Sequence, residues 1–521
     1  MSDTDYLVVG SGLAGLAFAA LMAARGRSVR VLEAHEHPGG FGHTFAFETA
    51  GGKRFTFNAQ LHYVWNCGEG QTVHRFLSRL GLEREVTFTS YDPLGYDRMR
   101  MPGWALDVCF DWDVLGDRLA DLFPAHARAC RGFLGEVRAL SEELARVPSP
   151  PWRTARMLLS PRRFRRVFRW RHATLQDAFD RFGVPPEAQA LLALQWPDFL
   201  LPPRELSFFA WSMLFAGYQG GAWYPARHFE HVVDTLVAFI ERHGGEVRMK
   251  RRVVEFVLEG RAVRGVVAEE VNADGEGTGL RERICAAEVV CNMDPRRAAE
   301  MIGLDRLAPA VRRRLDYAYS PSSFVAYCAV EGLDLREHGF GRSNLFHAEH
   351  PDLNRAFHEM YRLGDYRRPS FAVTTPTLLT DVARDCTEGT QILQLLTVAD
   401  WHRFHGLRIG RPAAYTRKKR EVVDAMLDVL ERDYVSGLRA HLCFHMTGSP
   451  TTSERYCLAP MGNAYGSAMT PAQVGANRLD HRTSLDRFHF CNASSGFAGF
   501  AGTIWTGCRL YEHLTGDIVL S

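Results

Sequence analysis

The chain has 521 residues, too many for one hydrophobic core, so two domains or one domain with large insertions are expected. Hydrophobic residues make up 46% and charged residues 23%, as in ordinary soluble globular proteins. The net charge of +2 argues against nucleic-acid binding through overall charge. Eleven cysteines without a C-x-x-C pair favour free thiols in a reducing compartment over disulfides or a zinc site. No metal is therefore predicted.

The N-terminal stretch has the order of a dinucleotide-binding unit: a hydrophobic strand, a glycine turn, an Ala- and Leu-rich helix and a second strand ending in Glu33. Gly10 permits a tight turn, Gly12 lets the backbone approach a pyrophosphate, and Gly15 lets helix and strand pack closely. The helix N-terminus offers free N–H groups to phosphates, and the Glu33 carboxylate would accept hydrogen bonds from ribose hydroxyls. The cofactor contacts predicted here are Gly10, Gly12, Leu13, Ala14, Gly15, Glu33 and Ala34.

A second glycine cluster follows soon after this acid, in the run Gly39-Gly40-Phe41-Gly42-His43. It resembles the flavoprotein pattern in which an acid-ended strand runs into a Gly-Gly turn beside the flavin and its phosphates. An NAD dehydrogenase does not need this second turn. The alternative is an ordinary surface turn, since Pro-Gly-Gly favours turns anywhere. FAD is therefore the predicted cofactor, with Gly39, Gly40 and His43 among its contacts.

After two expected half-buried strands the chain continues with Asn58-Ala59-Gln60-Leu61-His62-Tyr63. The order of strand, Gly-Gly cluster, F-x-F-(D/N) and H-Y resembles the phytoene desaturase, carotenoid isomerase and retinol saturase family of FAD enzymes. That family tends to have Asp and Gly where this chain has Asn58 and Gln60. The resemblance implies that His62 and Tyr63 line a substrate channel near the flavin. Packed, hydrogen-bonded side chains are the alternative.

From residue 81 to residue 216 the pattern becomes mostly helical. Apolar residues recur at three- and four-residue spacing, which predicts helices at Leu115–Leu122, Phe133–Arg146 and Thr174–Phe182. The segment is rich in Trp and Phe and lies between two cofactor segments. Aromatic residues at helical spacing also occur in plain cores, so its place in the chain is what favours a substrate-covering domain.

Within this segment, Trp152–Arg171 contains no acidic residue and interleaves arginines with large apolar side chains. At a membrane surface each arginine would gain about 1 kcal/mol from anionic lipid, while Trp and Phe enter the headgroup layer. The alternatives are a solvated basic face and a basic rim that pairs with acids elsewhere in the chain. One basic helix without a recognised motif is thin support for nucleic-acid binding. A peripheral contact with an anionic membrane is predicted.

The α/β rhythm resumes over residues 217–295. A Tyr-Pro segment, a helix, Gly244-Gly245, three successive strands and the run Val289-Val290-Cys291-Asn292-Met293-Asp294-Pro295 follow one another. The family has the same succession, although it usually has glycines after Tyr-Pro, where this chain has Ala226-Arg227-His228. The resemblance implies an adenine contact at Val253 and a cofactor contact at Asn292.

Residues 296–440 are mixed, with expected strands at Phe324–Val330 and Gln391–Val398 and a long helix at Ala413–Asp433. The runs Gly448–Tyr456 and Met461–Gly466 then resemble the retinol saturase and carotenoid isomerase branch. A final helix that begins with small residues could bring its N-terminus against the flavin and pyrophosphate. The resemblance implies cofactor contacts at Ala493, Gly502 and Thr503 and offers Tyr456 as a catalytic candidate.

The predicted fold is α/β, with a discontinuous Rossmann-like FAD-binding domain and an inserted α+β substrate domain. Residues 1–80, 217–295 and 441–521 are assigned to the FAD-binding domain, and residues 81–216 and 296–440 to the substrate domain. No basic region precedes the first strand, so no secretory signal peptide is predicted. A cytoplasmic protein with a peripheral contact to the inner face of a membrane is expected.

The resemblance implies an FAD-dependent oxidoreductase that desaturates, saturates or isomerises carbon–carbon bonds of a long apolar polyene or isoprenoid. His62, Tyr63 and Tyr456 are the catalytic candidates by family position. Two alternatives remain: a flavin amine oxidase, and a non-enzymatic lipid-binding protein of the Rab escort or GDP-dissociation inhibitor type. The sequence does not identify the electron acceptor or donor, and no nucleic-acid partner is expected.

Overall fold

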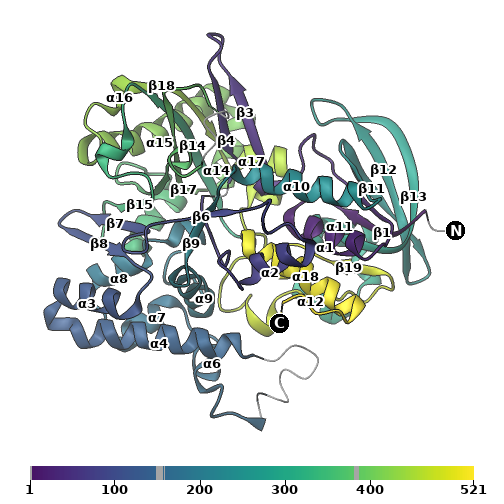
Figure 1. The fold of residues 1–521 in the computed structure, drawn as a ribbon, viewed down its shortest axis with the longest axis horizontal. Coiled ribbons are helices and arrows are strands. Elements are labelled where there is room, and N and C mark those ends of the chain that lie inside the picture. Colours follow the sequence, from purple (N-terminus) through teal and green to yellow (C-terminus); the bar gives the residue numbers. More distant parts are fainter. Residues whose placement is uncertain (1–2, 61, 148–156, 158, 381–385, 521) are drawn as a thin grey trace.

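A computed structural model describes residues 3–60, 62–147, 157, 159–380 and 386–520. Two seven-stranded sheets organise the chain, one on each side of the molecule in Figure 1. Helices of the middle segment, drawn in blue, extend below the second sheet. All eleven cysteines are free thiols. Among the described residues, no helix has both the length and the apolar character needed to cross a membrane.

The first sheet has the strand order β10-β2-β1-β13-β12-β11, and β19 also pairs with β13. Its parallel part takes strands from three distant segments of the chain, because β1 lies between β2 and β13 and β13 also pairs with β19. The bounds are β1 (Thr4–Val9), β2 (Val29–Leu32), β10 (Glu246–Arg248), β11 (Arg251–Glu259), β12 (Ala262–Val271), β13 (Gly277–Cys291) and β19 (Phe488–Phe490). This discontinuous Rossmann-like arrangement confirms the predicted fold class.

Helix α1 (Leu13–Ala24) packs between this sheet and two further helices, α10 (His228–Arg242) and α18 (Phe500–Thr515). It is apolar on every side, and all residues from Leu13 to Ala23 are buried, as expected for a helix enclosed by protein. Gly507 of α18 allows the closest approach, since a Cβ there would lie 2.5 Å from the carbonyl oxygen of Ala14. The packing places the N-termini of α1 and α18 at the same cavity.

The second sheet has the order β18-β14-β17-β16-β15-β7-β8. Its bounds are β7 (Asp97–Met101), β8 (Trp104–Val108), β14 (Ser322–Glu331), β15 (Asn344–Ala348), β16 (Ser370–Thr374), β17 (Thr390–Ala399) and β18 (Leu442–Gly448). Strand β18 pairs with β14, so the domain boundary expected at residue 441 is wrong for this strand. Strands β7 and β8, within the segment predicted to be mostly helical, join the sheet through β15.

The helices predicted in the middle segment are confirmed as α3, α4 and α7, and the long helix near the C-terminal third as α15. The middle segment contains α3 (Trp112–Leu122), α4 (Ala127–Ala145), α6 (Arg165–Trp170), α7 (Leu175–Phe182), α8 (Pro186–Ala193) and α9 (Phe208–Gln219). Later in the chain come α14 (Trp401–Gly410), α15 (Pro412–Asp433) and α17 (Pro450–Cys457). The hairpin of β3 (Thr44–Glu48) and β4 (Arg54–Asn58) projects at the top of Figure 1. Three short strands, β5 (Val64–Trp65), β6 (Phe88–Ser90) and β9 (Ala222–Pro225), form a separate sheet.

Candidate active site

A cavity of about 1860 Å³ extends from the glycine turns of the first sheet to the helices of the middle segment. Most residues predicted from sequence line it. They are Gly10, Gly12, Leu13, Ala14, Glu33, Ala34, Gly39, Gly40, His43, His62, Tyr63, Val253, Asn292, Tyr456, Ala493, Gly502 and Thr503. Gly15 is not in the lining. It lies behind the turn, where a Cβ would come within 2.8 Å of the Gly10 carbonyl oxygen.

The two glycine clusters lie side by side. Gly12 and Gly39 form a parallel β-bridge, and the Gly39 N–H donates to the Ser11 carbonyl oxygen at 3.1 Å. Gly10 and Gly39 have φ values of 100° and 103°, a region that side-chain-bearing residues rarely adopt. A Cβ on Gly12 would lie 2.6 Å from Oδ1 of Asn292. The turns therefore present bare backbone and the N-terminus of α1 to the cavity, as a diphosphate requires.

Glu33 follows the end of β2, with one carboxylate oxygen bound to the first glycine turn and the other to the backbone just beyond. Oε2 accepts from the backbone N–H of Ser11 at 2.8 Å and from its hydroxyl at 2.7 Å, while Oε1 accepts from the His35 N–H at 2.9 Å. A carboxylate has about four acceptor positions, so capacity remains for a ribose hydroxyl. The Arg251 N–H donates to the Glu33 carbonyl oxygen at 2.7 Å, which brings the start of β11, and Val253 beyond it, beside the acid.

The loop after β19 is held by asparagine side chains. Asn492 Oδ1 accepts from the N–H groups of Ser494 and Ser495 at 3.1 and 3.0 Å, and Asn292 donates to the Cys491 carbonyl oxygen at 2.5 Å. Helix α18 begins just beyond, and its first residues line the cavity. The Thr503 hydroxyl donates to the Gly499 carbonyl oxygen at 2.8 Å, so within α18 this side chain bonds its own helix.

Arg478 lines the cavity and was missed by the sequence reasoning, since nothing marks it in its loop. It is buried, and it donates to the carbonyl oxygens of Gly496 and, at 2.6 Å, Ala493. Burial lowers its pKa to about 10. Among the described residues no carboxylate lies within 4.0 Å of it, so this buried cation lacks a counter-charge. Together with the glycine turns and Glu33, it fits an anionic dinucleotide such as FAD.

The three predicted catalytic residues occupy different surroundings. His62 is buried with both ring nitrogens unpartnered, and burial lowers its pKa to about 4, so it is neutral at neutral pH. Tyr456 is 45% exposed and lies edge-on to the ring of His35, just past the end of β2. Tyr63 instead contacts acids of the middle segment, where its ring stacks on Tyr218 with centroids 4.2 Å apart. The three candidates therefore line one cavity but have different partners.

Two aspartates that the sequence reasoning missed meet at Tyr63. Its hydroxyl lies 2.9 Å from Oδ2 of Asp97 and 3.1 Å from Oδ2 of Asp198. Burial raises the pKa of Asp97 to about 7 and raises that of Asp198 well above its usual range. Asp97 occupies an inward position of the alternating strand β7, and Asp198 is a single acid in a long apolar run. Those two patterns were the available signals for buried acids.

Helix α6 lies beside the far end of the cavity, which Val167, Phe168 and Arg171 help to line. Arg166 pairs with Glu136 and Glu143 of α4, in each case with a nitrogen–oxygen distance of 3.0 Å. The expectation that the large apolar side chains of this stretch are free for lipid is wrong for Trp170, which is buried and donates to Glu136 at 2.8 Å.

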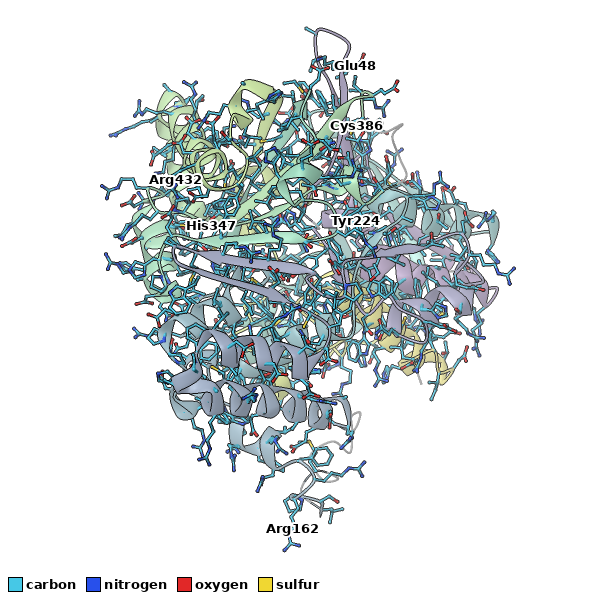
Figure 2. All side chains as sticks on the ribbon, turned by 60° about the vertical axis from the view of Figure 1, so that its left-hand side comes forward. Glu48, Arg162, Tyr224, His347, Cys386 and Arg432 are labelled. Carbon is cyan, nitrogen blue, oxygen red and sulfur yellow. The ribbon has the colours of Figure 1, made fainter. Side chains whose placement is uncertain are left out.

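Three described arginines of the stretch, Arg162, Arg163 and Arg165, are exposed, and Figure 2 shows Arg162 at the extreme lower end of the molecule. Residues 152–156 and 158 of the predicted docking stretch lie outside the described residues.

His347, Glu349 and Asp433 form a group with metal-ligand chemistry, away from the cavity lining. Arg432 forms ion pairs with both carboxylates, so a guanidinium already neutralises them. Figure 2 labels Arg432 and His347 at the left of the view. Because a cation is already present there, this group does not point to a metal centre.

Residues 8–80 match the family model described as an NAD(P)-binding Rossmann-like domain. All-trans-retinol 13,14-reductase of Danio rerio is 22% identical, covering 96% of this chain and 84% of its own length. The zeta-carotene-forming phytoene desaturase of Myxococcus xanthus is 24% identical, covering 71% and 68%. Prolycopene isomerase of Daucus carota is 20% identical, covering 99% and 81%.

Solved structures share the fold. An oxidoreductase from Methanosarcina mazei has a TM-score of 0.63 at 14% identity, covering 98% of this chain and 100% of its own. Putrescine oxidase bound to putrescine has a TM-score of 0.63 at 13% identity, covering 99% of each chain. Cyclohexylamine oxidase of Brevibacterium oxydans has a TM-score of 0.61 at 18% identity, covering 98% and 99%. At these identities the likeness concerns the fold alone.

Proposed function

We propose that this chain is a member of the phytoene desaturase, carotenoid isomerase and retinol saturase family and an FAD-dependent oxidoreductase that acts on carbon–carbon bonds of a long apolar polyene, as its similarity to relatives with these names suggests. The observation that carries the proposal is the cavity, which joins a dinucleotide cradle to a chamber lined by aromatic and apolar side chains. On the chamber side these include Tyr63, Phe199, Phe209, Met213, Leu214, Tyr218 and Tyr465.

The chain's own residues would bind and orient the cofactor. The glycine turns and the α1 N-terminus would take the diphosphate, Glu33 the adenosine ribose, and Arg478 an anionic part of the molecule. FAD supplies two-electron chemistry that no protein side chain provides. The chamber would exclude water and hold the polyene in register with the ring system. The buried, neutral His62 adds two unpartnered ring nitrogens to this wall.

The decisive experiment begins with the colour and extracted cofactor of the purified protein. FAD released on denaturation, identified by chromatography, is expected. The protein is then reduced without oxygen and mixed with polyenes of graded length, and in a second arm the oxidised protein receives more saturated isoprenoids. A change in the flavin spectrum with a matching change in the polyene spectrum supports the proposal. A flavin that responds to no polyene or isoprenoid in either arm would overturn it.

An amine oxidase is the second candidate, because Asp198 lies among tyrosines in the chamber and the fold is shared with amine oxidases. An ionised carboxylate within an aromatic cage attracts an ammonium group. In that case primary amines would bleach the oxidised flavin under anaerobic conditions and release peroxide in air. A lipid-binding protein of the Rab escort type would instead purify without flavin.

We also propose that the protein is cytoplasmic and contacts the inner face of an anionic membrane through the α6 region. The exposed arginines 162, 163 and 165 lie near the end of the cavity that α6 lines, so lipid contact there would shorten the path of an insoluble polyene. Arg162, Arg163 and Arg165 changed together to Gln should weaken sedimentation with anionic liposomes, and salt should weaken that of the wild type.

The matched control changes Arg408, Arg417 and Arg420 to Gln. These arginines are also exposed and lie on α14 and α15. Their replacement removes the same amount of positive charge from another part of the molecule. Arg166 is left unchanged because its pairs with α4 hold the helix in place. Equal sedimentation of the α6 variant and the control would contradict the docking role.

A further inference from the structure

The contacts of Tyr63 require a proton on one of its two aspartates. A phenol has one proton to donate, yet its oxygen lies 2.9 Å from an oxygen of Asp97 and 3.1 Å from an oxygen of Asp198. If both acids were ionised, one of these contacts would join two oxygens with no proton between them. The fully buried Asp97 and the partly buried Asp198, linked through one hydroxyl, would also repel each other if both were ionised. The group therefore holds one carboxylate and one neutral carboxylic acid.

The surrounding donors assign the negative charge to Asp97. Asn344 donates to its Oδ1 at 3.0 Å and Gln195 to its Oδ2 at 2.5 Å, in addition to the Tyr63 hydroxyl. Hydrogen bonds of this kind stabilise the ionised form of a buried acid. Asp198 has the Tyr63 hydroxyl as its hydrogen-bond partner, and Tyr218 and Tyr465 lie near enough to feel its charge. The protonated Asp198 therefore donates a hydrogen bond to Tyr63 Oη, and the Tyr63 hydroxyl donates its own proton to the Asp97 carboxylate.

Only the neutral end of this chain reaches the reaction chamber. Asp198 and Tyr63 line the cavity, whereas Asp97 is fully buried behind them and is not part of the lining. The other lining acids are engaged elsewhere. Glu33 binds the glycine turn, Asp294 caps α11 (Pro295–Ile302), Asp480 pairs with Arg314 and Arg482, and Glu512 accepts from the C-terminal backbone.

We propose that Asp198 is the catalytic acid–base of this enzyme, exchanging one proton with the polyene, while Tyr63 and Asp97 act as positioning residues whose hydrogen bonds and charge favour a proton on Asp198. This inference rests on the proposed function. In the saturating direction the C=C π bond breaks, and one carbon gains hydrogen with two electrons from a reductant of the reduced-flavin class. The neighbouring carbon forms its new C–H bond with the Asp198 proton, which leaves a carboxylate. Desaturation is the reverse.

The arrangement also explains how Asp198 recovers its proton. After it has given up the proton, two carboxylates share the single Tyr63 hydroxyl inside the protein. Their repulsion favours proton uptake from water before the next turnover. Tyr63 itself is a poor acid here, because burial and the two aspartates raise its pKa well above the usual range. The acid–base role therefore belongs to Asp198 and not to Tyr63, the residue suggested by family position.

The first test needs no substrate. Infrared spectra of protein carrying carboxyl-labelled aspartate should show, at neutral pH, a protonated carboxylic-acid carbonyl band that shifts with the label. Asp198→Asn should remove this band, and the exposed control Asp180→Asn on α7 should leave it unchanged. Asp97→Asn should move the pH at which the band disappears downward, because it removes the negative neighbour of Asp198. A band that survives in Asp198→Asn would overturn the assignment.

The second test uses FAD-loaded protein and a polyene to which the wild type responds. Asp198→Asn should keep FAD content and KM while kcat falls by about 10²- to 10⁴-fold, the usual contribution of a general acid. Tyr63→Phe should retain more activity but shift the pH profile, which a merely structural role would not do. A wild type inert to every polyene overturns the proposed function and this role with it. An active Asp198→Asn with unchanged kcat overturns the role alone.

Discussion

Glu33 offers the sharpest test of the cofactor site, because its carboxylate ties the first glycine turn to the end of β2 and is available for a ribose. Glu33→Ala removes the acceptor for the Ser11 N–H and hydroxyl and for the His35 N–H. It also removes the proposed ribose contact, a hydrogen bond to a charged group worth about 1.5–3 kcal/mol. FAD affinity should therefore fall by about one to two decades.

The assay titrates FAD into apoprotein and follows the quenching of flavin fluorescence. Glu36→Ala is the matched control, since this acid stands three residues further on, is exposed and does not line the cavity. The FAD affinity of Glu33→Gln should lie between those of Glu33→Ala and Glu36→Ala, because the amide keeps one acceptor oxygen. Circular dichroism must show a folded variant. If Glu33→Ala binds FAD as tightly as Glu36→Ala does, the ribose assignment is wrong.

Three further predictions concern the turn, the α6 contact and pH. Gly12→Ala should weaken FAD binding by about 1–3 kcal/mol, because the added Cβ would lie 2.6 Å from Asn292 Oδ1. A variant that binds FAD with wild-type affinity would contradict the close packing of Gly12 against Asn292. Arg166→Gln should lower the free energy of unfolding by about 2 kcal/mol in urea titrations, whereas Arg162→Gln should leave it unchanged. Burial lowers the pKa of His228 to about 4, below that of the unfolded chain, so its protonation favours unfolding as pH falls. Stability should drop by about 2 kcal/mol between pH 7 and pH 5 through this residue, and His228→Asn, which tolerates the positive φ, should flatten that part of the profile.

The cofactor end of the site could be predicted from sequence because its geometry is local. Gly10, Gly12 and Glu33 lie within one strand–helix–strand unit, and backbone sterics require glycine where φ is positive. The apolar periodicity of the middle segment likewise located α3, α4 and α7. The family resemblance then identified the chain's relatives before any tertiary contact was known. These features depend on short stretches whose spacing alone carries the signal.

The reaction end of the cavity depends on contacts between residues far apart in the chain. Asp97 on β7 meets Tyr63 from 34 positions away, and Asp198 meets it from 135 positions away. The parallel pairing of β7 with β15 also sets Asn344 opposite Asp97. Which strands and side chains come together depends on how the whole sheet buries its apolar face. A short stretch of sequence does not contain that information. The same holds for Arg166, which looked like one of several free arginines until α4 placed two glutamates against it. Sequence thus determined the dinucleotide fold, while only the packing of distant segments decided which acid holds a proton in the chamber.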